Sequence, residues 1–119
     1  MNYIDFEAGN KTYKLRLGTR AIVLLEKQLG CNPLSIFGAS GDTVPTITTM
    51  VTILHAALTQ YNHGITLNDA YDIFDEYLAG GKSAVDFIPV ILEIYRASGI
   101  IPKEDNSKII PKEDNSKND

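Results

Sequence analysis

Residues 3–17 read YIDFEAGNKTYKLRL, and this stretch decides the fold class. Polar and apolar residues alternate up to a central Gly-Asn pair, and the alternation resumes after it. The second half puts Tyr13, Leu15 and Leu17 on one face and basic residues on the other. Strict alternation on both sides of a Gly-Asn pair is typical of a β-hairpin. An isolated hairpin is only marginally stable in water, so this one needs a partner to pack on.

Helices supply that partner. Apolar residues recur at helical spacing and predict helices over about 20–29, 46–61, 67–78 and 83–97. Pro33 permits at most a short turn after the first of them. Glycine-containing segments end each helix. We therefore predict an α+β fold that is mostly helical, with an N-terminal β-hairpin packed on about four helices.

The sequence beyond the last predicted helix repeats itself. The nonapeptide IIPKEDNSK occupies residues 100–108 and again residues 109–117. A segment this rich in charged and polar residues cannot bury a core, which predicts disorder. We expect one domain over residues 1–99, followed by a disordered polar tail over residues 100–119 that is dispensable for folding.

Length and charge narrow the class of protein. The chain has 119 residues, of which 44% are hydrophobic, and a net charge of -4, which suits a single small domain. Eleven basic residues against fifteen acidic ones argue against a nucleic-acid partner. No apolar run reaches the roughly 18–20 residues of a membrane span. The first residues lack the pattern of a signal peptide, and one cysteine excludes an internal disulfide. We expect a cytosolic protein.

Catalytic and cofactor-binding motifs are not apparent in the sequence. The GGKS segment at residues 80–83 lacks the glycine of a phosphate-binding loop, because Glu76 stands in its place. His55, His63 and Cys31 have no further ligand at metal-binding spacing. We therefore predict no catalytic residue, no cofactor and no metal. A small hydrolase or transferase is the least favoured functional class.

Acidic residues recur along the third predicted helix. Asp69, Asp72, Asp75 and Glu76 follow one another at spacings that place them on much of one helix face. Asp69 also favours the helix N-terminus through the helix dipole. Two interpretations stay open: a solvated helix face, or an acidic contact for a basic partner segment. On the second, Asp72, Asp75 and Glu76 are candidate partner-binding residues.

The last predicted helix is apolar around most of its circumference. Such a helix is normally buried on more than one side. It is either a central core helix, or one of its faces meets another subunit or a partner chain. The second interpretation makes Phe87, Val90 and Ile94 partner-binding residues and predicts self-association or client binding through them. The face expected to point into the core comprises Val85, Ile88, Leu92 and Tyr95.

Three stretches of the chain carry a resemblance to a known family. They are KTYKLRLGTRAIVLLEKQLG at residues 11–30, ILHAALTQYNHGITLNDAYDIFDEYL at residues 53–78, and the final apolar helix. In this order they resemble the tail assembly chaperones of long-tailed bacteriophages and prophages. The resemblance covers about residues 3–98 and lies in the order of the elements more than in any single motif.

The resemblance implies a protein-binding role without catalysis. Such chaperones bind the long helical tape measure protein, keep it soluble and help to recruit tail tube subunits around it. They act in the host bacterial cytoplasm, are absent from the finished virion, and are often made in two lengths by ribosomal frameshifting. The alternative is a small bacterial adaptor or regulatory domain that binds another protein through its last helix.

Overall fold

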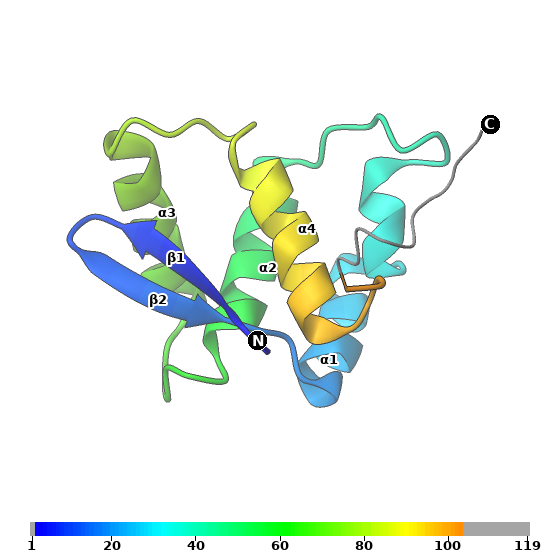
Figure 1. Ribbon diagram of the computed structural model, residues 1–119, viewed down its shortest axis with the longest axis horizontal. Coiled ribbons are helices and arrows are strands. Elements are labelled where there is room, and N and C mark those ends of the chain that lie inside the picture. Colours follow the sequence, from blue (N-terminus) through cyan, green and yellow to red (C-terminus); the bar gives the residue numbers. More distant parts are fainter. Residues whose placement is uncertain (1, 104–119) are drawn as a thin grey trace.

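The computed structural model describes residues 2–103 and has the predicted α+β architecture. A two-stranded antiparallel hairpin precedes four α-helices and a short 3-10 helix (Figure 1). In chain order the elements are β1 (Ile4–Ala8), β2 (Lys11–Leu15), α1 (Thr19–Leu29), η1 (Pro33–Phe37), α2 (Ile47–Leu58), α3 (Leu67–Ala79) and α4 (Phe87–Ser98).

The hairpin follows the alternation of its sequence. The register pairs Ile4 with Leu15 and Ala8 with Lys11, so that Gly9 and Asn10 form the turn between the strands. One face buries Phe6, Ala8 and Leu15, while the neighbouring residues of both strands stay exposed. Because successive side chains of a strand point to opposite faces, the hairpin has one buried face and one exposed face, as its sequence predicts.

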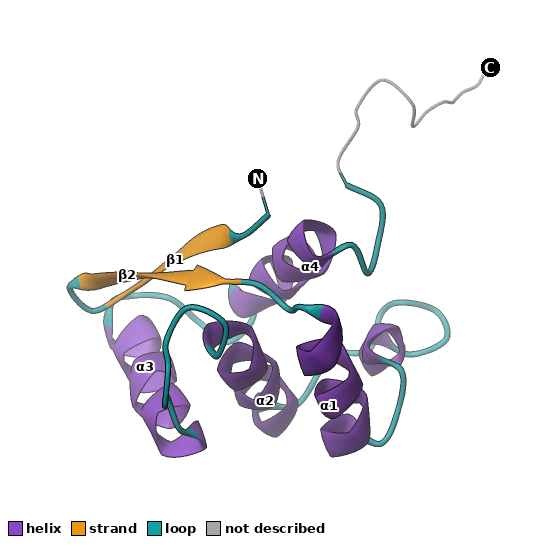
Figure 2. Ribbon diagram, turned by 90° about the horizontal axis from the view of Figure 1, so that it is seen from below, coloured by secondary structure: helices purple, strands orange, loops and turns teal. Residues whose placement is uncertain are grey.

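The elements are arranged in two layers (Figure 2). Helices α1, α2 and α3 lie side by side with α2 in the middle, and the hairpin and α4 cover one side of them. Helix α2 packs against β2 and α4 as well as against both flanking helices. Its apolar side chains from Met50 to Leu58 are consequently buried. This packing offsets the low helix propensity of its threonines.

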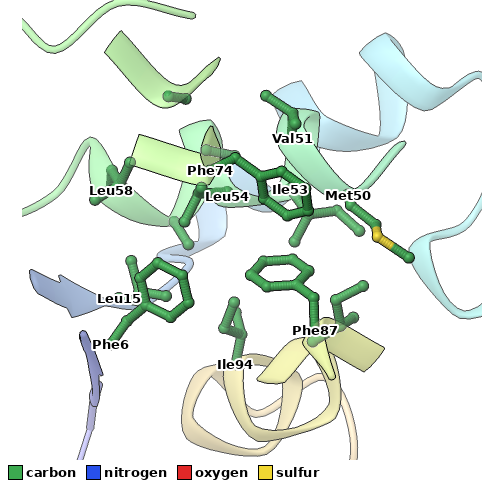
Figure 3. Close-up of a cluster of buried hydrophobic side chains, with 14 of the residues drawn as sticks. Phe6, Leu15, Met50, Val51, Ile53, Leu54, Leu58, Phe74, Phe87 and Ile94 are labelled. Carbon is green, nitrogen blue, oxygen red and sulfur yellow. The ribbon is translucent and has the colours of Figure 1, made fainter. Parts of the chain in front are cut away.

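Phe87 lies at the centre of an aromatic cluster that joins the two layers (Figure 3). Its ring meets those of Phe6, Phe74 and Tyr77 edge to face, with centroids 5.7, 5.3 and 5.8 Å away. Edge-to-face pairs add about 0.5–1.5 kcal/mol each to the gain from burial. The first residue of α4 is thus a principal core residue.

The predicted orientation of the last helix is wrong. Phe87 and Ile94, expected on a partner-binding face, have no exposed surface, and Val90 is half-buried against the core. Val85, expected in the core, is 65% exposed. The side chains that α4 buries are Phe87, Ile91, Ile94 and Tyr95, which recur at intervals of four, three and one. Only Tyr95 belongs to the face assigned from the sequence.

The start of α4 explains the error. Ser83 and Asp86 exchange hydrogen bonds in a turn that precedes the helix, and the helix begins at Phe87. Val85 therefore lies outside the helical repeat on which the predicted face was built. Pro89 falls in the first helical turn, where backbone N–H groups have no partner within the helix, so its missing N–H costs no hydrogen bond.

The folded part reaches beyond Gly99, where the sequence analysis ended it. Gly99 adopts a left-handed conformation with φ +82°. The backbone N–H groups of Gly99 and Ile100 donate to the carbonyls of Arg96 (3.2 Å) and Tyr95 (2.9 Å). This pattern is a Schellman cap. Ile100 and Ile101 then pack, half-buried, against the core.

Disorder is predicted for residues 100–119, of which residues 104–119 include the second copy of the nonapeptide. Residues 104–119 lie outside the described residues.

Truncation after Gly99 is expected to lower the melting temperature by about 5 °C or more relative to truncation after Lys103. The shorter chain loses the N–H group of Ile100 from the cap and the packing of two isoleucines. Burying part of such a side chain stabilises the fold by about 1 kcal/mol or more. Thermal unfolding of the two truncated chains tests this. Equal melting temperatures would show that these isoleucines contribute nothing to the core.

Candidate partner-binding cleft

The hairpin turn, the loop between α2 and α3, and α3 itself line an open cleft of about 620 Å³. Figures 1 and 2 show the turn of the hairpin beside α3. Ionisable and polar side chains dominate the lining. They include Lys11 and Tyr13 from the hairpin, His63 from the loop, and Asp69, Asp72 and Glu76 from α3.

Glu76 lies directly against the hairpin turn. A Cβ atom at Gly9 would stand 2.9 Å from Oε1 of Glu76, which is closer than a Cβ contact allows. Gly9 also has φ +63°, a conformation that residues with a side chain rarely adopt. The positive φ is the reason that the turn requires glycine, because the exposed end of the Glu76 side chain can move away from a Cβ atom. The backbone of the turn lies close to Glu76 and forms the wall of the cleft beside that carboxylate.

Tyr13 forms the neighbouring part of this wall. Partial burial, and secondly the negative charge of Glu76, raise the pKa of the Tyr13 hydroxyl above its ordinary value. The phenol is consequently neutral throughout the physiological pH range. It offers the cleft a hydrogen-bond donor next to a carboxylate.

Asp69 lines the cleft and also caps α3. Its carboxylate accepts a hydrogen bond from the backbone N–H of Thr66 (2.9 Å), and the hydroxyl of Thr66 accepts one from the backbone N–H of Asp69 (3.1 Å). This pair of reciprocal hydrogen bonds is a capping box. Two hydrogen bonds from Thr66 lower the pKa of the Asp69 carboxyl below its ordinary value. The bond from the backbone has the larger effect, and the bond from the side chain has the smaller one. A substitution of Asp69 would therefore change the helix start as well as the cleft.

The charge of the cleft is negative. The carboxylates of Asp69, Asp72 and Glu76 face a single basic side chain, Lys11, together with His63. Across residues 2–103 no ion pair ties Lys11 to these acids. Clefts lined by one sign of charge concentrate the field and attract the opposite sign. The arrangement therefore suits a cationic segment, such as a lysine or arginine side chain of another protein.

The predicted acidic residues divide between two surfaces. Asp72 and Glu76 lie one helical turn apart on α3, and the structure brings both to the cleft. Asp75 is exposed but does not line it. The three apolar candidates of the last helix contribute no exposed partner-binding face, since Phe87 and Ile94 are core residues and Val90 packs against the core.

Lys11, Tyr13 and His63 are cleft residues that sequence reasoning missed. They come from segments about fifty residues apart, and periodicity within one element carries no information about such a pairing. The one signal in the sequence is Gly9, because a glycine in a turn can indicate that the backbone lies close to another element. That signal names no partner, so it did not point to Glu76.

Comparison with known proteins places the chain in a family. Residues 4–117 match DUF6096, a family of unknown function, and the chain belongs to it. The match includes both copies of the nonapeptide, so the repeated tail lies within the region that this family covers. No curated protein and no solved structure matches the chain significantly.

Among residues 2–103 there is no group of three or more histidine, cysteine, aspartate or glutamate side chains that could hold a metal ion. In the same part of the chain no helix combines the length and the apolar character needed to cross a bilayer.

Proposed function

We propose that this chain is a tail assembly chaperone of a long-tailed bacteriophage or prophage. It binds the tape measure protein in the host cytoplasm, helps to recruit tail tube subunits during assembly, acts without catalysis or a cofactor, and is absent from the mature virion.

The acidic cleft is the observation that carries this proposal. Its lining combines the carboxylates of Asp72 and Glu76 with the neutral hydroxyl of Tyr13. A basic segment of a client would find both opposite charge and a hydrogen-bond donor there. Each contact between exposed charges speeds association and adds about 0.2–1 kcal/mol of affinity, so a few of them give a modest affinity. A chaperone that must later release its client needs this kind of reversible contact.

The resemblance to phage tail assembly chaperones supports the choice of client. It rests on the hairpin that runs into an apolar helix, on the acidic helix after a short polar loop, and on the final apolar helix. The hairpin, the acidic helix and the loop before it are the elements that line the cleft. The resemblance and the charge pattern therefore both point to the acidic helix and the segments beside it.

Co-expression with the tape measure protein of the same genome tests the proposal. That protein is recognisable as a very long helical coding sequence that follows this gene after an overlapping reading frame. We expect the tape measure protein to be insoluble alone, and soluble and co-purified when the chain is present. If it stays insoluble and does not co-purify, the proposal is wrong. Specific capture of an unrelated bacterial protein instead would favour the adaptor alternative.

A further inference from the structure

Large exposed apolar side chains occur on both outer helices of the three-helix layer. On α1 they are Val23 and Leu24, which are 43% and 54% exposed. On α3 they are Leu67, Tyr71 and Leu78, which are 40%, 46% and 36% exposed. Helix α2, which lies between α1 and α3, exposes only Ile47 near its first turn. Exposed apolar groups of this kind mark interaction surfaces.

The exposed surface of α1 is apolar and basic. Arg20, Val23, Leu24 and Lys27 are spaced as i, i+3, i+4 and i+7, so they share one side of the helix, opposite the buried Leu25. We call these four residues the α1 face. Within the part of the chain that the structure describes, neither Arg20 nor Lys27 forms an ion pair. The two charges are therefore available to a partner.

The exposed surface of α3 is apolar and acidic. Leu67, Tyr71, Asp75 and Leu78 recur at intervals of four, four and three, and they share one side of the helix. We call these four residues the α3 face. Asp72 lines the cleft at the border of this face and adds a second negative charge there. The α3 face thus carries the same kind of apolar surface as the α1 face, with charge of the opposite sign.

We propose that the α1 face of one molecule binds the α3 face of a second copy of this chain. The two helices flank α2 on opposite sides of the layer (Figure 2). They are similar in length, with 11 and 13 residues. A contact between two different surfaces is heterologous, and repeated copies build a ring or a helical filament.

Charge selects this pairing over the symmetric ones. An α1 face against another α1 face would bring Arg20 and Lys27 toward their own counterparts. An α3 face against another α3 face would do the same with Asp75. Opposed like charges disfavour such contacts, whereas the α1–α3 pairing brings opposite charges together around an apolar centre. The inference is independent of the proposed client, and the α3 face shares with the cleft only the residue at their border, Asp72.

A charge-reversal experiment on the chain alone tests this interface. One variant carries Arg20→Glu and Lys27→Glu, a second carries Asp72→Lys and Asp75→Lys, and an Asp42→Lys control changes an exposed loop residue. We expect the wild type and the control to form oligomers at low salt as concentration rises. Each double variant should self-associate about tenfold or more weakly, because two attractions become repulsions.

Mixing the two double variants gives the decisive result. Every α1–α3 contact between them again joins opposite charges, so an equimolar mixture should regain the oligomers that each variant has lost. Sedimentation velocity measures this, with circular dichroism melts to show that both variants stay folded. A wild type that is monomeric at every concentration, or a mixture that remains monomeric, would overturn the inference. Because no client is present, neither outcome bears on the chaperone proposal.

Discussion

Ile94→Glu is expected to leave the domain largely unfolded at 25 °C. The Ile94 side chain has no exposed surface and lies in the core, where α4 packs on α2 and β1. A glutamate there would be either an unpaired buried charge or a buried neutral acid without a hydrogen-bond partner. Either form would lower the free energy of unfolding by several kcal/mol. A domain of this size has only about 5–15 kcal/mol of stability in total. Far-UV circular dichroism and a thermal melt measure the loss.

Val85→Glu is the matched control for this variant. Val85 precedes the same helix and is 65% exposed, so the same charge should leave the melting temperature within about 3 °C of the wild type. If instead Ile94→Glu folds normally and Val85→Glu does not, α4 presents the opposite face to the core. That was the orientation predicted from the sequence.

Neutralising the cleft is expected to weaken client binding about tenfold at low salt. The variant Asp72→Asn with Glu76→Gln keeps the shape of both side chains and removes two of the three carboxylate charges of the cleft. Asp69 is left unchanged because it caps α3. Isothermal titration with a basic segment of the tape measure protein measures the difference. It should shrink as salt is raised to about 0.5 M, because exposed charges are then screened.

Asp75→Asn provides the control for this experiment. It removes one charge from the same helix at a position outside the cleft, so client affinity should stay close to that of the wild type. A free-energy loss in Asp75→Asn about half that of the double variant would mean that the client responds to the overall charge of the chain. No loss in either would mean that the acidic side of α3 is only solvated surface.

The local elements of this fold could be predicted from the sequence because each carries its own signal. Alternation on both sides of the Gly-Asn turn specifies the hairpin, and the pair Thr66 and Asp69 marks the start of α3. Such signals depend on neighbours within a few residues along the chain. They are therefore present in the sequence in full.

The orientation of α4 could not be predicted in this way. The helix is apolar around most of its surface, so several stripes fit the helical period equally well. The choice between them depends on the Phe87 ring, which packs against β1 and α3, and on the hydrogen bond that the Tyr95 hydroxyl donates to the carbonyl of Pro33 (3.0 Å). These contacts join distant segments, and periodicity does not record them.

Only half of the candidate site could be predicted from the sequence, namely the acidic half on α3. The spacing of Asp72 and Glu76 places both on one helix face, and this needs no tertiary information. The opposite wall comes from the hairpin turn and from the loop before α3. Only the packing of the hairpin over α3 brings these segments to the acidic helix, so the cleft itself could be recognised only in the structure.

An NMR titration of the ¹⁵N-labelled chain with a basic tape measure segment tests the central claim most directly. The account predicts that amide shifts change first at Lys11, Tyr13, His63 and Ile73, which surround the cleft, while those of Val23 and Leu24 on α1 stay unchanged. Binding that shifts the amides of α1 and leaves the cleft residues unaffected would contradict it.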